Sequence, residues 1–481
     1  MKEQIEKFLL QVTKPARYVN NEWNAVHKDW EQVETKVVFA FPDVYEVGMS
    51  HLGIKILYHI LNQKENIVAE RTFSPWVDME DKLRQHQIPL FSLESKAPLR
   101  DFDIIAFTLQ YEMSYTNILN ILDLGQIPLT QEERGQDYPV IIAGGPGAFS
   151  PEPLADFVDA FIVGDGEEII VQFVELYQQM KKAGKSKAEF LQEAARTLRG
   201  IYVPAFYRVE YQAEGTIASM EPLQEEYPFP VLRQVVEDLD QVPYPEEFVV
   251  PSIEVVHDRI TLEIQRGCSR GCRFCQAGVI YRPVRERTLE NLEALAEKLV
   301  EKTGYNEISL SSLSTSDYSC LPELVANLLN KYKEKRIGLS LPSLRIDSFS
   351  VDLAQMVQEV RKTGLTFAPE AGTQRLQDVI NKGVTEEDLL RAAESAFSAG
   401  WLKLKLYFMI GLPTETYEDL DGIVDLAKKV AFLGERIRKE KGIKIPIRIT
   451  DSASSFVPKP HTPFQWEAQF SLEELENRQR Y

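Results

Sequence analysis

The amino-acid sequence predicts an α/β protein in which a doubly wound domain precedes a partial (β/α)6 barrel. From about residue 36, short runs that are apolar throughout alternate with helical patterns, as is typical of parallel strands covered by helices on both faces. A second series, of six strand–helix units, begins near residue 259. The length agrees with this division, because 481 residues leave room for about two to four domains.

Residues 36–195 are predicted to form the doubly wound domain, behind a lead helix and arm in residues 1–35. Its predicted strands are "KVVFAFP", "FDIIAFTL", "PVIIAGG" and "VDAFIVGDGE", and its clearest helices are "HLGIKILYHILNQ" and "EIIVQFVELYQQMKKAG". In such sheets ligands bind at the carboxyl ends of the strands. Two glycine-rich segments, 143–153 and 163–168, follow strands at such places, and glycine lets backbone approach a ligand closely. Tight turns alone would explain either segment equally well.

Residues 196–258 are predicted to form a hairpin and then a linker rich in proline and acidic residues. The partial barrel is expected over residues 259–470, and residues 471–481 are expected to start a C-terminal extension. The predicted barrel strands are "RITLEIQRG", "EISLSSLS", "IGLSLPSLRID", "LTFAPEAG", "WLKLKLYFMIGLP" and "IPIRITDSASSF". The predicted helices are "TLENLEALAEKLVEKTG", "LPELVANLLNKYKEK", "VDLAQMVQEVRKTG", "EEDLLRAAESAFSAG" and "YEDLDGIVDLAKKVAFLGERIRKE". Active sites of such barrels collect at the carboxyl ends of the strands.

The charge balance and the N-terminus restrict the functional class. The chain has 54 Lys and Arg against 73 Asp and Glu, a net charge of −19, which argues against broad nucleic-acid binding. A local basic groove around Arg282, Arg285 and Arg287 remains open. The first residues are charged and lack a secretory apolar core, and no apolar run reaches the ~18 residues that span a bilayer. We therefore expect a soluble, cytoplasmic protein.

Three of the four cysteines lie within eight residues, in "QRGCSRGCRFCQAG" after the first predicted barrel strand. The spacing of Cys268, Cys272 and Cys275 is C-x3-C-x2-C, which does not look like a secreted disulfide framework. Three close thiolates can hold three corners of a cubane 4Fe-4S cluster and leave the fourth iron open to a ligand. Structural zinc or free thiols are the alternatives; zinc would need a fourth ligand, and the only other cysteine is Cys320.

This cysteine motif strongly resembles that of the radical SAM superfamily. The resemblance implies that the open iron binds the amino and carboxylate groups of S-adenosylmethionine (SAM). It also implies that an electron from the cluster cleaves SAM to a 5′-deoxyadenosyl radical. A reductant such as flavodoxin or ferredoxin would supply that electron.

The resemblance also assigns SAM-binding roles to residues that follow the later barrel strands. The segment after the second strand matches the family's contact to the SAM amino group, although it lacks the usual Gly-Gly-Glu. Glu370 matches a contact to the ribose hydroxyls, Lys382 a contact to the SAM carboxylate, and the Gly411–Pro413 turn a contact along adenine. The expected SAM residues are Ser311, Ser312, Ser314, Ser343, Arg345, Glu370, Lys382, Gly411 and Pro413.

The first domain resembles the cobalamin-binding domains that precede many radical SAM barrels. The usual Asp-x-His-x-x-Gly motif reads "DVYEVG" here, with Tyr45 where the family has its cobalt-ligating histidine. His51 lies nearby, and a lone histidine at a helix start is more often a cap or packing residue. The expected cobalamin positions are Asp43, Tyr45, Gly48, Thr108, Gly144, Gly145 and Gly164. The whole chain looks like a little-characterised family of such proteins, whose members often carry or neighbour a further C-terminal domain.

Several functions remain open at this point. Methyl transfer through cobalamin is slightly favoured over a cobalamin-free hydrogen abstraction, and a non-catalytic sensor that binds cluster and SAM is the alternative from another class. A methylthiotransferase is rejected, because residues 1–267 contain no cysteine for a second cluster. The substrate is not indicated: a small molecule, a peptide or a modified RNA base would all fit.

Overall fold

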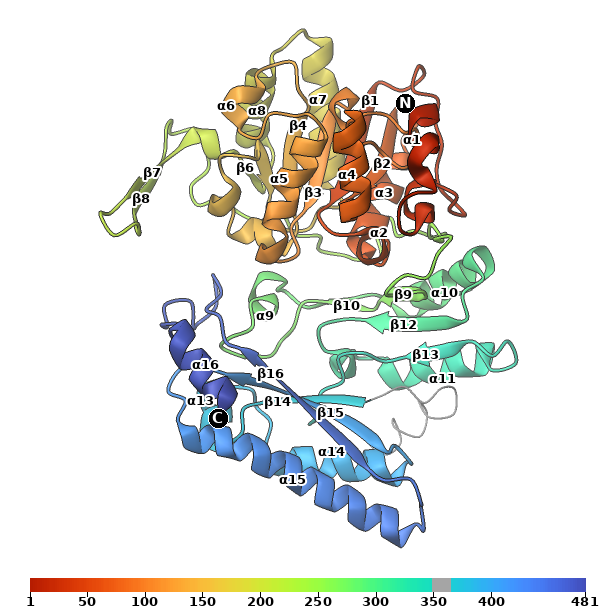
Figure 1. Ribbon diagram of the computed structural model, residues 1–481, viewed down its shortest axis with the longest axis vertical. Helices are drawn as coiled ribbons and strands as arrows, with labels where there is room; N and C mark the ends of the chain where they lie inside the picture. Colours follow the sequence, from red (N-terminus) through yellow and green to blue (C-terminus); the bar gives the residue numbers. More distant parts are fainter. Residues whose placement is uncertain (348–364) are drawn as a thin grey trace. The chain divides into compact units, whose positions relative to one another are not determined.

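The computed structural model describes residues 1–347 and 365–481, and it divides the chain into two compact units (Figure 1). The first unit contains residues 1–258 with 301–303, and the second contains residues 259–300 and 304–481. The helix predicted at "VDLAQMVQEVRKTG", residues 351–364, lies outside the described residues.

The first unit is built on a six-stranded sheet of order β2-β1-β3-β4-β5-β6. The first five strands are parallel, and β6 is antiparallel to β5. The strands are β1 (Thr35–Phe41), β2 (Ile67–Phe73), β3 (Ile104–Thr108), β4 (Val140–Gly144), β5 (Ala160–Ile162) and β6 (Ile201–Tyr202). Almost all of their residues are buried, which explains the uninterrupted apolar runs.

Helices cover both faces of this sheet, as the doubly wound prediction requires. In Figure 1, α4 and α5 cross in front of the strands, and α3 and α7 lie behind them. The helices are α1 (Lys2–Leu9), α2 (Tyr45–Gly48), α3 (Leu52–Asn62), α4 (Val77–His86), α5 (Tyr115–Leu124), α6 (Gln131–Arg134), α7 (Ile169–Lys182) and α8 (Lys187–Thr197). The order β2-β1-β3-β4-β5 places the switch in winding direction between β1 and β3.

Strand β2 is absent from the sequence prediction. Its sequence, "IVAERTF", is fully buried and pairs along its whole length with β1, but two adjacent charged residues interrupt its apolar pattern. The predicted hairpin is confirmed as β7 (Tyr207–Tyr211) and β8 (Ile217–Pro222), which are antiparallel. Residues 223–258 form neither helix nor strand, apart from isolated bridges, as expected of a linker.

The second unit contains the six predicted parallel strands, in two described sheets of three. The order β13-β12-β9 joins β9 (Ile260–Glu263), β12 (Glu307–Ser311) and β13 (Gly338–Ser340). The order β14-β15-β16 joins β14 (Leu365–Glu370), β15 (Lys403–Ile410) and β16 (Arg448–Ser455). The parallel strands of a partial barrel are therefore present, and residues 348–364, which come between β13 and β14 in the sequence, lie outside the described part.

Helices follow the strands of this unit as predicted. They are α9 (Ala277–Ile280), α10 (Leu289–Thr303), α11 (Leu321–Tyr332), α13 (Gln374–Val379), α14 (Glu386–Ser398), α15 (Tyr417–Glu440) and α16 (Leu472–Arg480). The capping is explicit in α14, where Thr385 and Asp388 form a reciprocal capping box. No helix among the described residues is long and apolar enough to cross a bilayer.

Candidate functional site

The cysteine loop leaves β9 and is closed by a short antiparallel ladder. Strand β10 (Gln265–Arg266) pairs with β11 (Arg285–Glu286), so that the chain returns to its starting point. Gly267 has φ +90, and a Cβ there would lie 2.6 Å from the carbonyl oxygens of both Tyr281 and Pro283. Glycine is required at this position because the two ends of the loop approach each other so closely.

The three cysteine thiols share one electrostatic environment inside this loop. Burial raises the pKa of Cys275, the thiols of Cys272 and Cys268 raise it further, and a hydrogen bond from the backbone of Gly278 and the charge of Lys382 oppose this. Gly278 N donates to Cys275 Sγ at 3.3 Å. The net pKa of Cys275 is raised, so the Gly278 N–H and Lys382 offset only part of the cost of forming the thiolate, the form that binds iron.

The chemistry of the donor set, three free thiols within one short loop, is of the kind that a 4Fe-4S cluster takes. A single zinc ion would need all its thiolates within about 2.3 Å of one centre. A cubane instead takes each thiolate on a different iron, so its ligands stand farther apart.

Hydrogen bonds to its backbone tie the loop to the residues that directly follow α13 and to itself. Asn381 Nδ2 donates to Gly271 O at 2.8 Å, and Arg273 N donates to Ile380 O at 2.9 Å. Arg282 Nη2 reaches Arg270 O at 2.8 Å. These contacts hold the loop's conformation through its peptide groups rather than through the cysteine side chains.

A charged network connects the loop to the ends of β12 and β13. Arg270 Nε donates to Asp317 Oδ2 at 2.9 Å, and its Nη1 lies 3.6 Å from Asp347 Oδ2. Ser314 Oγ donates to the same Asp317 oxygen at 2.7 Å. Although burial raises it, hydrogen bonds from Arg270 and Ser314 hold the pKa of Asp317 below its usual value. Arg270 and Asp317 were not predicted from the sequence; the available signal was a carboxylate six residues after β12 and an arginine between two cysteines.

Arg345 belongs to the same network. Its Nε donates to Asp347 Oδ1 at 2.9 Å, and its Nη2 donates to Lys382 O at 3.2 Å. The two other predicted polar residues near it make local contacts: Ser312 Oγ lies 3.0 Å from Thr315 Oγ1, and Ser343 accepts a bond from Thr315 N at 3.3 Å. Ser311, half-buried at the end of β12, accepts a backbone bond from Ile264.

Glu370 and Lys382 are brought together at the end of β14. Lys382 Nζ donates to Glu370 Oε1 at 2.9 Å, and it lies 5.9 Å from the centre of the Phe274 ring in the cysteine loop. Glu370 has φ +68, a left-handed conformation that is uncommon for a residue with a side chain. The structure therefore places both predicted residues beside the cysteine loop, paired with each other.

The predicted turn after β15 has a left-handed Gly411, with φ +80, followed by Leu412 and Pro413. The backbone nitrogen of Gly411 donates to Glu415 Oε1 at 2.9 Å. The same carboxylate oxygen accepts a bond from Arg478 of α16 at 2.7 Å. Neither Glu415 nor Arg478 was singled out from the sequence, because the two lie far apart along the chain.

In the first unit, the candidate residues after β1 are engaged by the protein itself. Tyr45 is buried and its hydroxyl donates to Glu22 Oε1 at 2.9 Å. A Cβ on Gly48 would lie 2.2 Å from the Phe73 ring. Asp43 Oδ1 accepts a bond from the adjacent Val44 N at 2.7 Å. His51 caps α3, as expected, since its Nδ1 accepts from Ile54 N at 3.3 Å.

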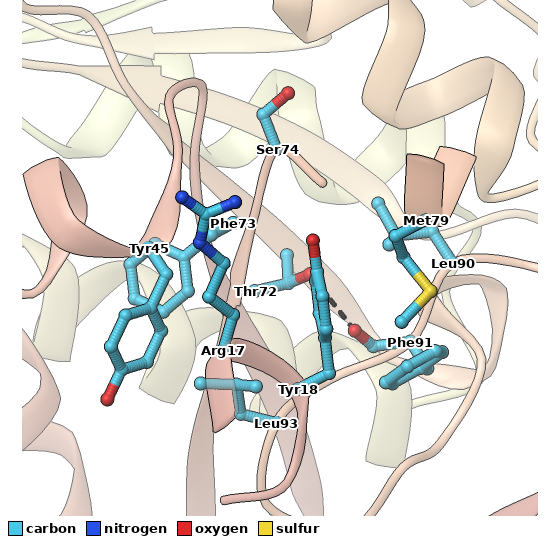
Figure 2. A pocket seen from close by; sticks show the side chains of 10 residues that line it. All are labelled: Arg17, Tyr18, Tyr45, Thr72, Phe73, Ser74, Met79, Leu90, Phe91 and Leu93. Carbon is cyan, nitrogen blue, oxygen red and sulfur yellow. Dashed lines mark hydrogen bonds between the residues drawn. The ribbon is translucent and has the colours of Figure 1, made fainter. Parts of the chain in front are cut away.

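Figure 2 shows the cavity that Tyr45 lines together with Arg17, Tyr18, Thr72, Phe73, Ser74, Met79, Leu90, Phe91 and Leu93. Its volume is ≈ 20 Å³, about enough for one water molecule. The hydroxyl of Thr72 donates across it to Phe91 O at 3.0 Å. This cavity is too small for a cofactor.

The glycines after β4 and β5 accommodate other backbone segments of the same unit. A Cβ on Gly145 (φ +105) would lie 2.9 Å from Leu109 O, and one on Gly164 (φ +112) would lie 2.1 Å from Gln234 O in the linker. Gly144 is not crowded in this way, since a Cβ there would meet Ile162 O at 3.6 Å. Close packing therefore accounts for Gly145 and Gly164. Thr108 differs: its Oγ1 is buried at the end of β3 without a hydrogen-bond partner among the described residues.

Comparisons with known proteins agree with the cysteine loop. Residues 262–427 match the family "Radical SAM superfamily", and residues 53–204 match the family "Radical SAM proteins, N-terminal". The chain therefore belongs to the radical SAM superfamily. Members of this superfamily are enzymes that use a 4Fe-4S cluster and SAM, and they need a substrate and a reductant.

Among individual proteins, the chain is 30% identical over 438 residues to the uncharacterized protein MJ0966 of Methanocaldococcus jannaschii, covering 90% of this chain and 79% of that one. Over 180 residues it is 27% identical to the ribosomal protein uS12 methylthiotransferase RimO of Pelotomaculum thermopropionicum, which is 36% of this chain and 40% of that one.

Two solved structures share the fold. The radical SAM methyltransferase TsrM of Kitasatospora setae, with cobalamin and a 4Fe-4S cluster bound, has a TM-score of 0.57 at 13% identity, covering 89% of this chain and 74% of that one. The cobalamin-dependent radical SAM enzyme OxsB has a TM-score of 0.59 at 14% identity, covering 93% of this chain and 61% of that one. At such identities the likeness is one of fold.

Proposed function

We propose that the chain is a cobalamin-dependent radical SAM enzyme that transfers a methyl group. The observation that carries the radical SAM part is the closed cysteine loop, with charged strand-end residues beside it. The cluster, when bound by Cys268, Cys272 and Cys275, supplies the electron that cleaves SAM. Flavodoxin or ferredoxin is the reductant we expect, and the substrate class stays open.

The residues beside the loop have separate tasks in this proposal. Lys382 offers an ammonium for the SAM carboxylate, and Glu370 offers a carboxylate for the ribose hydroxyls; each would exchange its present partner for SAM. Ser314 and Asp317 orient the segment after β12 toward the SAM amino group. Arg270 holds that segment against the cysteine loop, so that the cluster and SAM are positioned by one network.

The cobalamin part rests on the fold shared with TsrM and OxsB and on one feature of the first unit. Thr108 Oγ1 is a buried hydroxyl at the end of β3 that has no hydrogen-bond partner in the described part of the chain, next to the point where the winding direction of the sheet changes. A buried polar group of this kind is costly unless something binds it. Cobalamin, when bound there, would carry the methyl group.

Among the described residues, the candidate ligands near the first strand end are already engaged. The Nδ1 of His51 accepts the capping bond of α3, the His51 ring also forms a hydrogen bond with Gln110, and Tyr45 donates to Glu22. The cobalamin-loaded protein should therefore show a base-off spectrum and no histidine-nitrogen coupling in the Co(II) state.

Cobalamin-free hydrogen abstraction is the second candidate, because close packing already accounts for Gly145 and Gly164. A methylthiotransferase is disfavoured despite the match to RimO. A second cluster would need three further cysteines, and the chain has four in all.

The deciding experiment is anaerobic reconstitution of the cluster, followed by assay of 5′-deoxyadenosine and of cobalamin binding. Production of 5′-deoxyadenosine with SAM and reductant is expected. If no 5′-deoxyadenosine forms although the cluster is intact, a non-catalytic sensor that binds cluster and SAM would be favoured. Failure to bind cobalamin at micromolar concentration would favour plain hydrogen abstraction.

A further inference from the structure

The turn after β15 is held by a side chain from the last helix of the chain. Gly411 N points at Glu415 Oε1, and Arg478 of α16 donates to that same oxygen. Glu415 is thus an intermediary between the turn's backbone and α16. Its own nitrogen donates to Leu412 O at 3.0 Å, which closes the turn on itself.

The pair formed by Glu415 and Arg478 is almost fully buried, with side chains 1% and 7% exposed. Arg478 also donates through Nε to Glu474 Oε1 at 2.9 Å. Its guanidinium lies 4.3 Å from the Phe470 ring centre and 5.2 Å from that of Tyr417. A buried carboxylate is tolerated only with such partners, so Glu415 depends on Arg478 for its charge and its position.

Apolar packing brings α16 against the turn at the same place. A Cβ on Gly411 would lie 2.8 Å from Leu475 Cδ2 and 3.2 Å from Phe470 Cδ2, so the helix touches the turn's backbone directly. The end of the helix is anchored as well, because Gln479 Nε2 donates to Ser455 Oγ at 3.3 Å and the Tyr481 hydroxyl donates to Asp421 at 2.9 Å.

We propose that Arg478 is a positioning residue for the SAM site, acting through Glu415 on the backbone of the Gly411–Pro413 turn. This rests on the proposed function, in which that turn lies along the adenine of SAM. The left-handed Gly411 is oriented by its bond to Glu415, and the surface that the turn offers to a planar ring follows from that orientation. Helix α16 is therefore part of the support of the cofactor site.

The test compares two arginines of one helix in reconstituted full-length protein. Arg478 and Arg480 each pair with a glutamate four residues earlier, but only Arg478 reaches Glu415, and Arg480 is 72% exposed. Arg478→Ala should weaken SAM binding about tenfold, the effect of removing a buried partner behind a binding group, with unchanged iron content. Arg480→Ala should bind SAM like the unaltered protein.

A spectroscopic titration separates positioning from general damage. The EPR signal of the reduced cluster should change on SAM addition to the same final form in Arg478→Ala, but at about tenfold higher SAM. Arg478→Lys should restore part of the affinity, because lysine keeps the charge but lacks the planar fork that serves two carboxylates.

The outcomes distinguish this inference from the proposed function. If the unaltered protein binds no SAM, the proposed function fails. If it binds SAM and Arg478→Ala binds it equally well, Arg478 is not a positioning residue. Should Arg478→Ala not fold, Glu415→Gln and Arg478→Lys decide: weaker SAM binding with a full cluster supports the role, and unchanged affinity in both overturns it.

Discussion

Each unit has a network of paired charged side chains that can be compared. The network around Arg71 in the first unit is buried, and the network around Arg270 in the second unit is partly open to water. In the first unit, Arg71 of β2 lies between Glu94 and Glu22, and these side chains are only 1–3% exposed. In the second unit, Arg270 and Asp317 are 37% and 17% exposed; Arg270 lies in the cysteine loop, and Asp317 follows β12. Charges that are buried and paired hold a fold together, whereas charges that keep contact with water can exchange a protein partner for a ligand.

The strand-end glycines differ in what approaches them. Gly145 and Gly164 make room for other backbone of the first unit, Gly267 for the carbonyl groups that close the cysteine loop, and Gly411 for side chains at α16. A glycine after a strand indicates a close approach, and the sequence does not say what approaches.

The largest effect is expected at the cysteines. Cys268→Ala, Cys272→Ala and Cys275→Ala should each abolish the cluster, because a cubane held by three thiolates has no spare protein ligand. Iron and sulfide content after anaerobic reconstitution measures this. Cys320→Ala is the control and should keep about four irons and four sulfides per chain, since Cys320 starts α11 outside the cysteine loop. Loss of the cluster in Cys320→Ala would show that the ligand set is wrong.

Arg71→Ala should destabilise the first unit by about 3–5 kcal/mol, because it leaves Glu94 buried without its partner. Urea denaturation measures the loss, and iron content should stay normal because the cluster lies in the other unit. The control is Arg84→Ala, which breaks half-exposed surface pairs with Glu80 and Asp123 and should cost less than about 1 kcal/mol. Equal losses in the two variants would contradict the assignment of Arg71 to the buried network.

The buried network around Arg71 also explains why β2 was not predicted from the sequence while the other parallel strands were. Strands β1, β3, β4 and β5 are readable because their residues are apolar or small, apart from Lys36 near the start of β1, but β2 carries Glu70 and Arg71 in its middle. Their partners come from elsewhere in the chain: Trp30 Nε1 and Ser95 donate to Glu70, and Glu94 accepts from Arg71. A strand whose charges are neutralised by residues distant in sequence leaves no local signal.

The residues of the candidate site also fall into those that have a local sequence signal and those that do not. The cysteine spacing and the strand-end position of Glu370 and Lys382 are local features, and the structure brings them together. The bonds from Arg270 to Asp317 and from Arg478 to Glu415 depend on tertiary packing across 47 and 63 positions, so no spacing rule reveals them.

Glu370→Ala and Lys382→Ala should each weaken SAM binding by about 1–3 kcal/mol, the usual cost of losing a charged hydrogen bond, while the cluster survives. Equilibrium binding of SAM to the reconstituted protein measures this. A matched control is Lys429→Ala, which removes the half-exposed pair of Lys429 with Glu386 and should leave SAM affinity unchanged. Unaltered affinity in both site variants would remove Glu370 and Lys382 from the site.

The smallest effect concerns the pH dependence of stability, and it tests whether His51 belongs to the fold or to a cofactor. Burial lowers the pKa of His51 to about 4 from the usual 6.5, although a hydrogen bond with Gln110 raises it. Between these values the unfolded chain binds more protons than the folded one, so stability falls as the pH drops from 6.5 toward 4. At pH 5 this amounts to at most about 2 kcal/mol, from ~1.4 kcal/mol per pH unit.

His51→Asn should remove that contribution while keeping an acceptor for the cap of α3, so the loss of stability between pH 6.5 and 5 should become smaller. The measurement is urea denaturation at several pH values, with the exposed His27→Asn as a control that keeps the steeper dependence. Because the half-buried His59 also has a pKa lowered by desolvation, some acid sensitivity should remain in His51→Asn. If the variant instead keeps the full pH dependence and alters the spectrum of bound cobalamin, His51 serves the cofactor and not the cap.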